Sequence, residues 1–175
     1  MRELADEPRI QRLMRALGAA AAREGDCFLT GGATAVLIGW RPTTVDVDLM
    51  FEPEQDEVLR AIPQLKDELA VNVELASPGD FIPLPASWRE RSPLVTRLGL
   101  LTFRHFDPYS QVLAKLERAH ARDLEDVAEM ARRGLVEEGP LRERFAEIEP
   151  ELYRFPAIDA PAFRARVDAF AGRGE

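Results

Sequence analysis

Cysteine and histidine are scarce in this chain. Cys27 is the only cysteine among 175 residues, and there are two histidines. A single cysteine excludes an internal disulfide and a cysteine-built zinc site, which fits a reducing compartment. The two histidines lie far from any acidic pair in the sequence, so a histidine-rich transition-metal site is not expected. Cys27 itself lies in an apolar stretch, where a small buried side chain is expected rather than a nucleophile.

Long hydrophobic runs are also missing. No segment stays apolar over the about 20 residues that a membrane-spanning helix needs. The N-terminal residues are rich in acids and contain no apolar run of signal-peptide length. We therefore expect a cytoplasmic protein without a membrane partner.

Positive charge is the third shortage. The chain has 23 Lys and Arg against 31 Asp and Glu, a formal net charge of −8. This balance argues against a protein that coats nucleic acid non-specifically. One strip, residues 87–105, is locally basic, and it has two interpretations: a solvated surface or a contact for an RNA acceptor. Its charged residues are one acid, Glu90, and the arginines Arg89, Arg91, Arg97 and Arg104.

The remaining composition is that of a globular protein, with 46% hydrophobic and 31% charged residues. Periodicity and turn residues predict helices over 7–24, 33–39, 107–133 and 141–149, a helical stretch over 58–69 broken or kinked at Pro63, and a last helix opening at 159–161. They predict strands over 27–30, 44–51, 71–75 and 98–106. The order predicts an α/β (α+β) fold, a small mixed sheet flanked by helices. We expect a main domain over 1–135 and a C-terminal helical extension over 136–175.

The most informative stretch joins a glycine turn to a pair of aspartates. Gly31-Gly32 breaks the first strand where unusual backbone angles are cheap, and the helix that follows has N–H groups able to face an anion. On the next strand Asp46 and Asp48 share one face, ~6.6 Å apart. Two carboxylates so placed can bracket a divalent ion, or two ions roughly 3.5–4 Å apart. The stretch predicts a phosphate cradle beside a metal site.

A second motif lies in the predicted helix over 107–133, where Lys115-x-x-Arg118 is followed by Asp123-x-x-Asp126. On a helical wheel Asp123 falls within the apolar arc, where an unpaired carboxylate is costly. Two explanations stay open for Asp123. It forms a buried ion pair with a cation, or it supports the metal site. For Lys115, at the border of that arc, we favour a functional role.

Together these residues resemble the DNA polymerase beta-like nucleotidyltransferase superfamily. Its signature is Gly-Gly or Gly-Ser, a spacer and Asp-x-Asp, and its minimal members, including abortive-infection toxin nucleotidyltransferases, carry a similar helical motif. The resemblance covers about residues 28–135. It implies transfer of a nucleoside monophosphate from a nucleoside triphosphate such as ATP to an acceptor hydroxyl on RNA, protein or a small molecule, and a regulatory protein partner as in toxin–antitoxin pairs.

The resemblance also implies residue roles. Asp46 and Asp48 would hold Mg²⁺ (or Mn²⁺), with Glu74 of the strand over 71–75 as a third catalytic acid. Gly31 and Gly32 would present backbone N–H groups to the β- and γ-phosphates. The chain lacks the hydroxyl of the Gly-Ser form, and Thr30 or Thr34 is expected to replace it. The nucleotide-binding set is completed by residues of the helical motif: Lys115, which would reach the triphosphate, with Arg118, Asp123 and Asp126.

Two other classes of function compete with this one. A non-catalytic nucleotide-binding or regulatory protein could use the same scaffold, as the missing serine and the uncertain third acid suggest. The intact Asp46-x-Asp48 pair argues against a decayed site. An RNA-binding module of the antitoxin kind is disfavoured by the negative net charge.

Overall fold

The computed structural model describes residues 3–171, which form two compact units. The sheet unit comprises residues 3–77 and 92–106, and the helical unit comprises residues 78–91 and 107–171. The units therefore do not follow the expected division at residue 135. Residues 107–135 pack with the C-terminal helices, and residues 78–91 join them from within the sheet-forming part of the chain.

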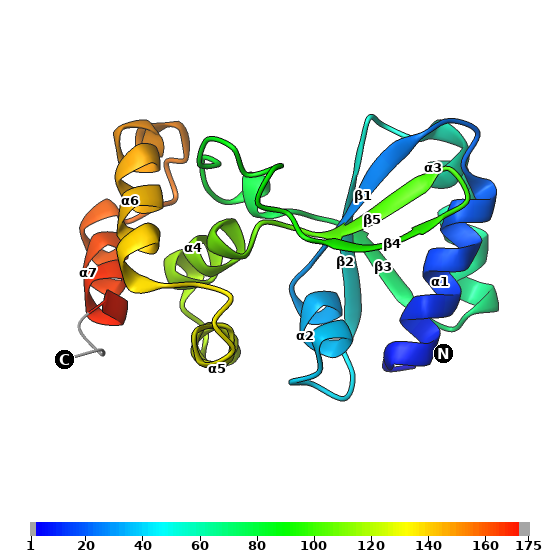
Figure 1. Cartoon of the computed structure of the whole chain (residues 1–175), viewed down its shortest axis with the longest axis horizontal. Helices are drawn as coiled ribbons and strands as arrows, with labels where there is room; N and C mark the ends of the chain where they lie inside the picture. Colours follow the sequence, from blue (N-terminus) through cyan, green and yellow to red (C-terminus); the bar gives the residue numbers. More distant parts are fainter. Residues whose placement is uncertain (1–2, 172–175) are drawn as a thin grey trace. The chain divides into compact units, whose positions relative to one another are not determined.

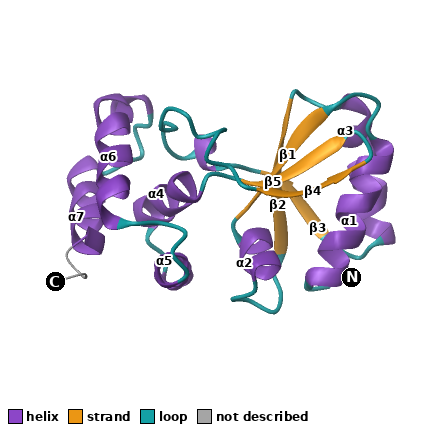
Figure 2. Ribbon diagram, viewed as in Figure 1, coloured by secondary structure: helices purple, strands orange, loops and turns teal. Residues whose placement is uncertain are grey.

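The sheet unit is built on a five-stranded mixed sheet in the order β3-β2-β1-β5-β4 (Figures 1 and 2). β1 pairs with β2 antiparallel and with β5 parallel, while β2 pairs with β3 parallel and β4 with β5 antiparallel. This confirms the predicted α/β fold. The strands are β1 (Gly25–Thr30), β2 (Asp46–Glu52), β3 (Asn72–Leu75), β4 (Leu94–Leu98) and β5 (Leu101–His105).

The strand predicted over 98–106 is β5, which begins three residues later, at Leu101. β4 was not predicted; it precedes β5 and the chain turns between them at Gly99-Leu100. β4 is an edge strand with an exposed, mixed pattern, so it lacks the alternation that marks a half-buried strand.

Three helices belong to the sheet unit: α1 (Glu7–Ala20), α2 (Gly32–Ile38) and α3 (Asp56–Glu68). α1 packs against α3, and α1 also contacts β4 and β5. The apolar faces of the helices form one core with the inward side chains of the sheet. This core includes Leu13 and Leu17 of α1 and Val47, Leu49 and Phe103 of the strands. α3 is continuous through Pro63, so the expected interruption was wrong, while a kink at Pro63 stays a prediction. The packing of Val58 and Ile62 into the core outweighs the hydrogen bond that proline removes.

The helical unit contains α4 (Pro108–Arg118), α5 (Ala121–Arg132), α6 (Glu138–Ile148) and α7 (Ala160–Ala171), with short 3₁₀ helices η1 (Pro78–Asp80) and η2 (Glu149–Arg154). α4 contacts α5, α6 and α7, and α6 packs on α7. Phe145 and Phe163 meet edge to face there, their ring centroids 4.9 Å apart.

The single helix predicted over 107–133 was wrong, because α4 ends and α5 begins at residues 119–120. Ala119 takes a left-handed backbone conformation with φ 55°, which a non-glycine residue adopts only at a cost. The carboxylate of Asp123 accepts the backbone N–H of His120 at 3.1 Å, which satisfies a donor at the start of α5. Nothing in the apolar periodicity marks this break.

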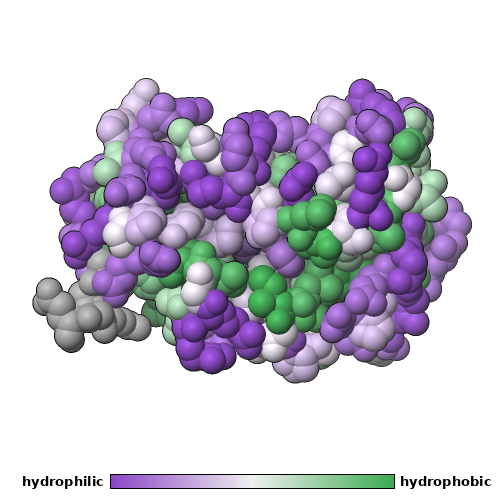
Figure 3. All heavy atoms as spheres, viewed as in Figure 1, coloured by the Kyte–Doolittle hydropathy of each residue, from purple (hydrophilic) through white to green (hydrophobic). Residues whose placement is uncertain are grey.

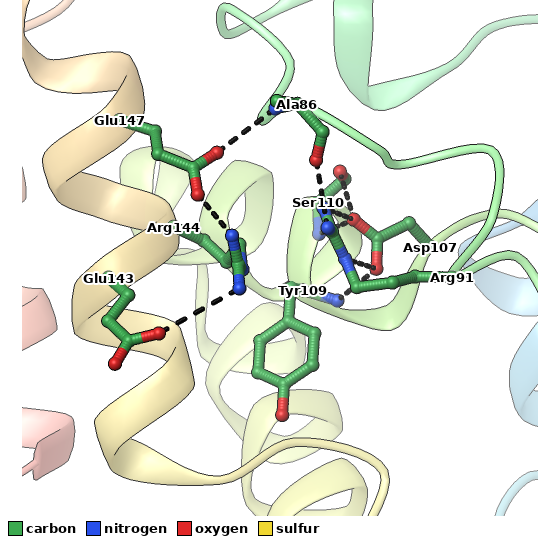
Figure 4. A network of polar contacts seen from close by, with 8 residues as sticks. All are labelled: Ala86, Arg91, Asp107, Tyr109, Ser110, Glu143, Arg144 and Glu147. Atoms are coloured by element: carbon green, nitrogen blue, oxygen red, sulfur yellow. Dashed lines mark hydrogen bonds and ion pairs between the residues drawn. The ribbon is translucent and has the colours of Figure 1, made fainter.

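The start of α4 was predicted correctly, with Asp107 as the N-cap before a proline. The Asp107 carboxylate is fully buried, and it accepts the N–H groups of Tyr109 and Ser110 at 3.2 and 3.3 Å. Figure 4 shows Arg91 approaching the same carboxylate from the 78–91 segment. Its Nε and Nη2 donate at 3.2 and 2.9 Å. This bidentate pair ties the 78–91 segment to α4.

Between residues 3 and 171 no helix has both the length and the hydropathy that crossing a membrane requires.

Candidate active site

The turn between β1 and α2 carries the two glycines that the sequence singled out. Gly31 has φ 60° and ψ −126°, a backbone conformation that glycine reaches without steric cost. A Cβ at Gly31 would lie 3.2 Å from Oδ2 of Asp48. A Cβ at Gly32 would lie 1.9 Å from Oγ1 of Thr44. Because neither glycine has a side chain, Asp48 of β2 fits against Gly31, and Thr44, just before β2, fits against Gly32.

The strand register places the aspartates next to this turn. Thr30, the last residue of β1, lies opposite Asp48, and Thr30 is buried. Val47 and Leu49, between and after the aspartates, are fully buried in the core. Asp46 and Asp48 therefore lie on the opposite face from those core residues, and both are half-buried. The turn and the two carboxylates meet at one end of the β1–β2 pair.

β3 extends this polar face, as its parallel register shows. Asn72 lies opposite Asp46, and Glu74 lies opposite Asp48. The Asn72 side-chain amide donates to Oδ1 of Asp46, and also to Oε1 of Glu74 at 3.4 Å. The amide of Asn72 thus joins a carboxylate of β2 to one of β3. Asn72 was not among the predicted site residues, although its position two residues before Glu74 in an alternating strand places it on this face.

The oxygen-rich donor set suits a hard divalent cation such as Mg²⁺, which takes carboxylate oxygens and keeps several waters. Asp46 and Asp48 supply two carboxylates on one face, and the adjacent Gly31 leaves space that a Cβ would narrow. Across residues 3–171, His, Cys, Asp and Glu side chains form no group of three or more placed to hold a metal ion. The residues therefore fit a cation held by two aspartates more directly than one held by three acids.

Thr34 lies in α2 but is nearly fully buried. Its hydroxyl donates to the carbonyl of Leu29 at 3.3 Å and lies 3.0 Å from Nδ1 of His105. Which of the two groups donates in the contact between Thr34 and His105 depends on the tautomer of the His105 ring. Burial lowers the pKa of His105 from 6.5 to about 4, so the ring is neutral at pH 7. This pair joins α2 to the end of β5.

The residues of the second motif form a buried ion cluster in the helical unit. Nζ of Lys115 lies 2.7 Å from Asp126 and 3.8 Å from Asp123. Arg118 donates to both oxygens of Asp123, at 2.8 and 2.6 Å. Lys115, Asp123 and Asp126 are 8%, 3% and 1% exposed. Each carboxylate thus has a cation partner, and together they connect α4 to α5 across the break at Ala119.

Two opposing influences act on the pKa of Asp123. Burial disfavours its charged form, while the hydrogen bond and charge of Arg118, the charge of Lys115 and the His120 N–H favour it. The net result is a pKa below the ordinary value, so Asp123 is ionised at neutral pH.

The four arginines of the basic strip divide between the two units, Arg89 and Arg91 in the helical unit and Arg97 and Arg104 in the sheet unit. Arg91 is paired with Asp107, Arg97 with Glu24 at 2.6 Å, and Arg104 with Asp26 at 3.3 Å. The guanidinium of Arg89 lies over the ring of Trp88, 4.5 Å from its centroid. Three of these charges are thus matched by nearby acids.

Hydrophobic side chains reach the surface near the aspartates. In the view of Figure 3, the surface over α2 is hydrophobic, and Leu37 and Ile38 of α2 are half-buried. Val45, immediately before Asp46, is 55% exposed. The polar site therefore has an apolar border.

The helical unit has a separate pocket of about 370 Å³, which contains none of the predicted site residues. Its apolar walls come from α4, α5 and α7, and one side is formed by Arg166. Nη1 of Arg166 donates to the carbonyls of Leu116 and Glu117 at 3.1 and 2.6 Å, so its charge lies at the C-terminal end of α4.

A family model described as "Nucleotidyltransferase of unknown function (DUF6036)" matches residues 9–157, which is most of the chain. The chain belongs to this family, and the predicted nucleotidyltransferase relationship is confirmed at that level. Searches of curated proteins and of solved structures gave no match.

Proposed function

We propose that this chain is a magnesium-dependent nucleotidyltransferase, which moves a nucleoside monophosphate from a nucleoside triphosphate to an acceptor hydroxyl. The family supports transfer of a nucleotidyl group. The observation that supports magnesium-dependent transfer is the close fit of the Gly31–Gly32 turn against the start of β2. Gly31 lies against the carboxylate of Asp48, and Gly32 lies against Thr44 at the entry to the same strand.

In this proposal Asp46 and Asp48 hold the divalent cation, and Glu74 contributes as a nearby third acid. When bound, the cation would neutralise charge on the triphosphate and lower the pKa of the acceptor hydroxyl. The backbone N–H groups of the Gly31–Gly32 turn bind the β- and γ-phosphates. Because glycine has no side chain, a phosphate oxygen can approach this backbone closely.

The reaction is a substitution at the α-phosphorus. The acceptor oxygen forms a bond to that phosphorus, the bond to the oxygen bridging the α- and β-phosphates breaks, and pyrophosphate leaves with the bonding electrons. The acceptor hydroxyl gives up its proton to a water molecule as it attacks. The chain's contribution is to align the acceptor with the departing oxygen and to stabilise the charge on both, which is how most phosphoryl-transfer sites act.

The ion pairs of Lys115, Arg118, Asp123 and Asp126 support a structural role in holding α4 against α5. Contact of Lys115 with the triphosphate stays a prediction. The pairing of Arg91, Arg97 and Arg104 with acids gives the RNA-acceptor proposal little support. Transfer to RNA or protein under the control of a partner, as in toxin–antitoxin pairs, is a specific form of the proposal that requires its own test.

A second candidate is a non-catalytic nucleotide-binding protein on the same scaffold. The bridge made by Asn72 favours it, because the amide donates to Glu74, the third acid that catalysis would use, as well as to Asp46. In this case Asp46 and Asp48 would bind a magnesium–nucleotide complex, and no nucleotidyl group would be transferred to an acceptor.

Calorimetry and a transfer assay test the proposal. We expect one of the four ribonucleoside triphosphates to bind with magnesium and to bind at least tenfold more weakly without it. Incubation with that nucleotide, labelled on its α-phosphate, and cell extract should then label RNA, a protein or a small molecule. Metal-dependent binding with no labelled acceptor would favour the non-catalytic candidate. If no triphosphate binds in the presence of magnesium, both candidates fail.

A further inference from the structure

Thr44 occupies the space that Gly32 leaves open. A Cβ built on Gly32 would lie 1.9 Å from Thr44 Oγ1 and 2.7 Å from Thr44 Cβ. Atoms do not approach so closely, so any side chain at position 32 would force Thr44 or the turn to move. The contact joins the first residue of α2 to the residue two before the start of β2.

Thr44 is itself held firmly. Its hydroxyl donates to the carbonyl of Asp46 at 2.9 Å. Its backbone N–H donates to Ala5, and its carbonyl accepts from Ala5, at 2.9 and 2.8 Å. Thr44 is only 7% exposed, and Ala5 is fully buried. The threonine thus has fixed partners on two sides and the glycine turn on a third.

These contacts place one side chain between the two halves of the candidate site. The Gly31–Gly32 turn lies on one side of Thr44, and the hydroxyl bonds to the backbone of Asp46 on the other. We propose that Thr44 is a positioning residue, which sets the spacing between the phosphate-binding turn and the aspartates of β2. Its hydroxyl fills the position from which a residue-32 side chain would start.

This inference rests on the proposed function, since the spacing matters only if turn and aspartates bind one ligand. In this proposal the effect of the largely buried Thr44 passes through Gly32 and Asp46.

A set of four variants tests the proposal, measured by metal-dependent nucleotide affinity and by melting temperature without nucleotide. Thr44→Val keeps the shape and loses the hydroxyl, and we expect at least tenfold weaker affinity. Thr44→Ser keeps the hydroxyl and should recover most of that affinity. Gly32→Ser should lower both affinity and melting temperature. Gly32→Ser combined with Thr44→Gly should recover much of the melting temperature, because the side chain then has room. It should not recover the affinity, because the Thr44 hydroxyl that bonds to Asp46 is gone.

Thr43→Val, a change at the half-buried neighbouring threonine, is the matched control. Thr44→Val with wild-type affinity would overturn the proposal, as would a double variant whose melting temperature is no higher than that of Gly32→Ser. If the wild type binds no nucleotide, the proposed function fails on its own account. The melting temperatures of the two single variants and the double variant then still show whether positions 32 and 44 are coupled, and so whether Thr44 fixes the turn, because this measurement needs no ligand.

Discussion

Acidic residues occur in two contrasting settings in this molecule. In the helical unit, Asp123 and Asp126 are buried and each is paired with a cation, Arg118 or Lys115. In the sheet unit, Asp46 and Asp48 are half-buried, share one face of β2, and adjoin a glycine turn and the amide of Asn72.

The difference separates acids paired with cations inside the fold from acids that border a glycine turn. A buried, fully paired carboxylate is expensive to unpair, so it contributes to the integrity of the fold. Two neighbouring carboxylates on one face repel each other, and a cation between them relieves that repulsion. Both settings supply an Asp-rich motif in the sequence, yet the proposed chemistry belongs to the second alone.

The largest effect is expected at Asp126. Asp126→Ala leaves the buried Lys115 ammonium without its 2.7 Å partner, and we expect the free energy of unfolding to fall by about 3–5 kcal/mol. Denaturant unfolding measures this, with Glu125→Ala, an exposed acid on the same helix, as the control. Replacing both partners, as in Lys115→Met with Asp126→Leu, should restore much of the loss. Equal, small effects of Asp126→Ala and Glu125→Ala would contradict the structural role.

The next effect concerns pH and the buried pair of His105 and Thr34. Burial lowers the pKa of His105 from 6.5 to about 4. Between pH 6.5 and about pH 4 the His105 ring is therefore mostly protonated in the unfolded chain and mostly neutral in the folded chain. Stability contributed by neutral His105 is complete above pH 6.5 and is lost as the pH falls to about 4, by up to roughly 3 kcal/mol.

Denaturant unfolding at pH 7 and at pH 5 measures the loss. His105→Gln should lower stability at pH 7 and flatten this pH dependence. His120→Gln, at a histidine with a 73% exposed side chain, should retain it. An unchanged slope in His105→Gln would mean that other groups cause the acid sensitivity.

The sequence predicted the strand–turn–helix–strand segment of the site because its signals are local. Two glycines end β1, an apolar run forms α2, and alternation puts Asp46 and Asp48 on one face. The N-cap of α4 was likewise visible in Asp107-Pro108.

The remaining features depend on contacts between distant residues. The fit of Thr44 against Gly32, the bridge of Asn72 to Asp46 and the pair of His105 with Thr34 all follow from strand register and packing. The break at Ala119 was missed because the apolar period continues through it. Residues 78–91 join the helical unit through contacts that no local pattern shows, among them the pair of Arg91 with the buried Asp107 and the bond of the Ala86 N–H to Glu147.

The most direct test of the central claim is the effect of magnesium on melting temperature in the wild type and in Asp48→Asn. Removing one charge of the β2 pair relieves repulsion, so Asp48→Asn should be as stable as the wild type, or more stable, without metal. Magnesium should raise the melting temperature of the wild type and of Glu57→Gln, an exposed acid on α3, but not that of Asp48→Asn. If Asp48→Asn unfolds the protein and magnesium does not stabilise the wild type, the pair is structural and the proposed site is wrong.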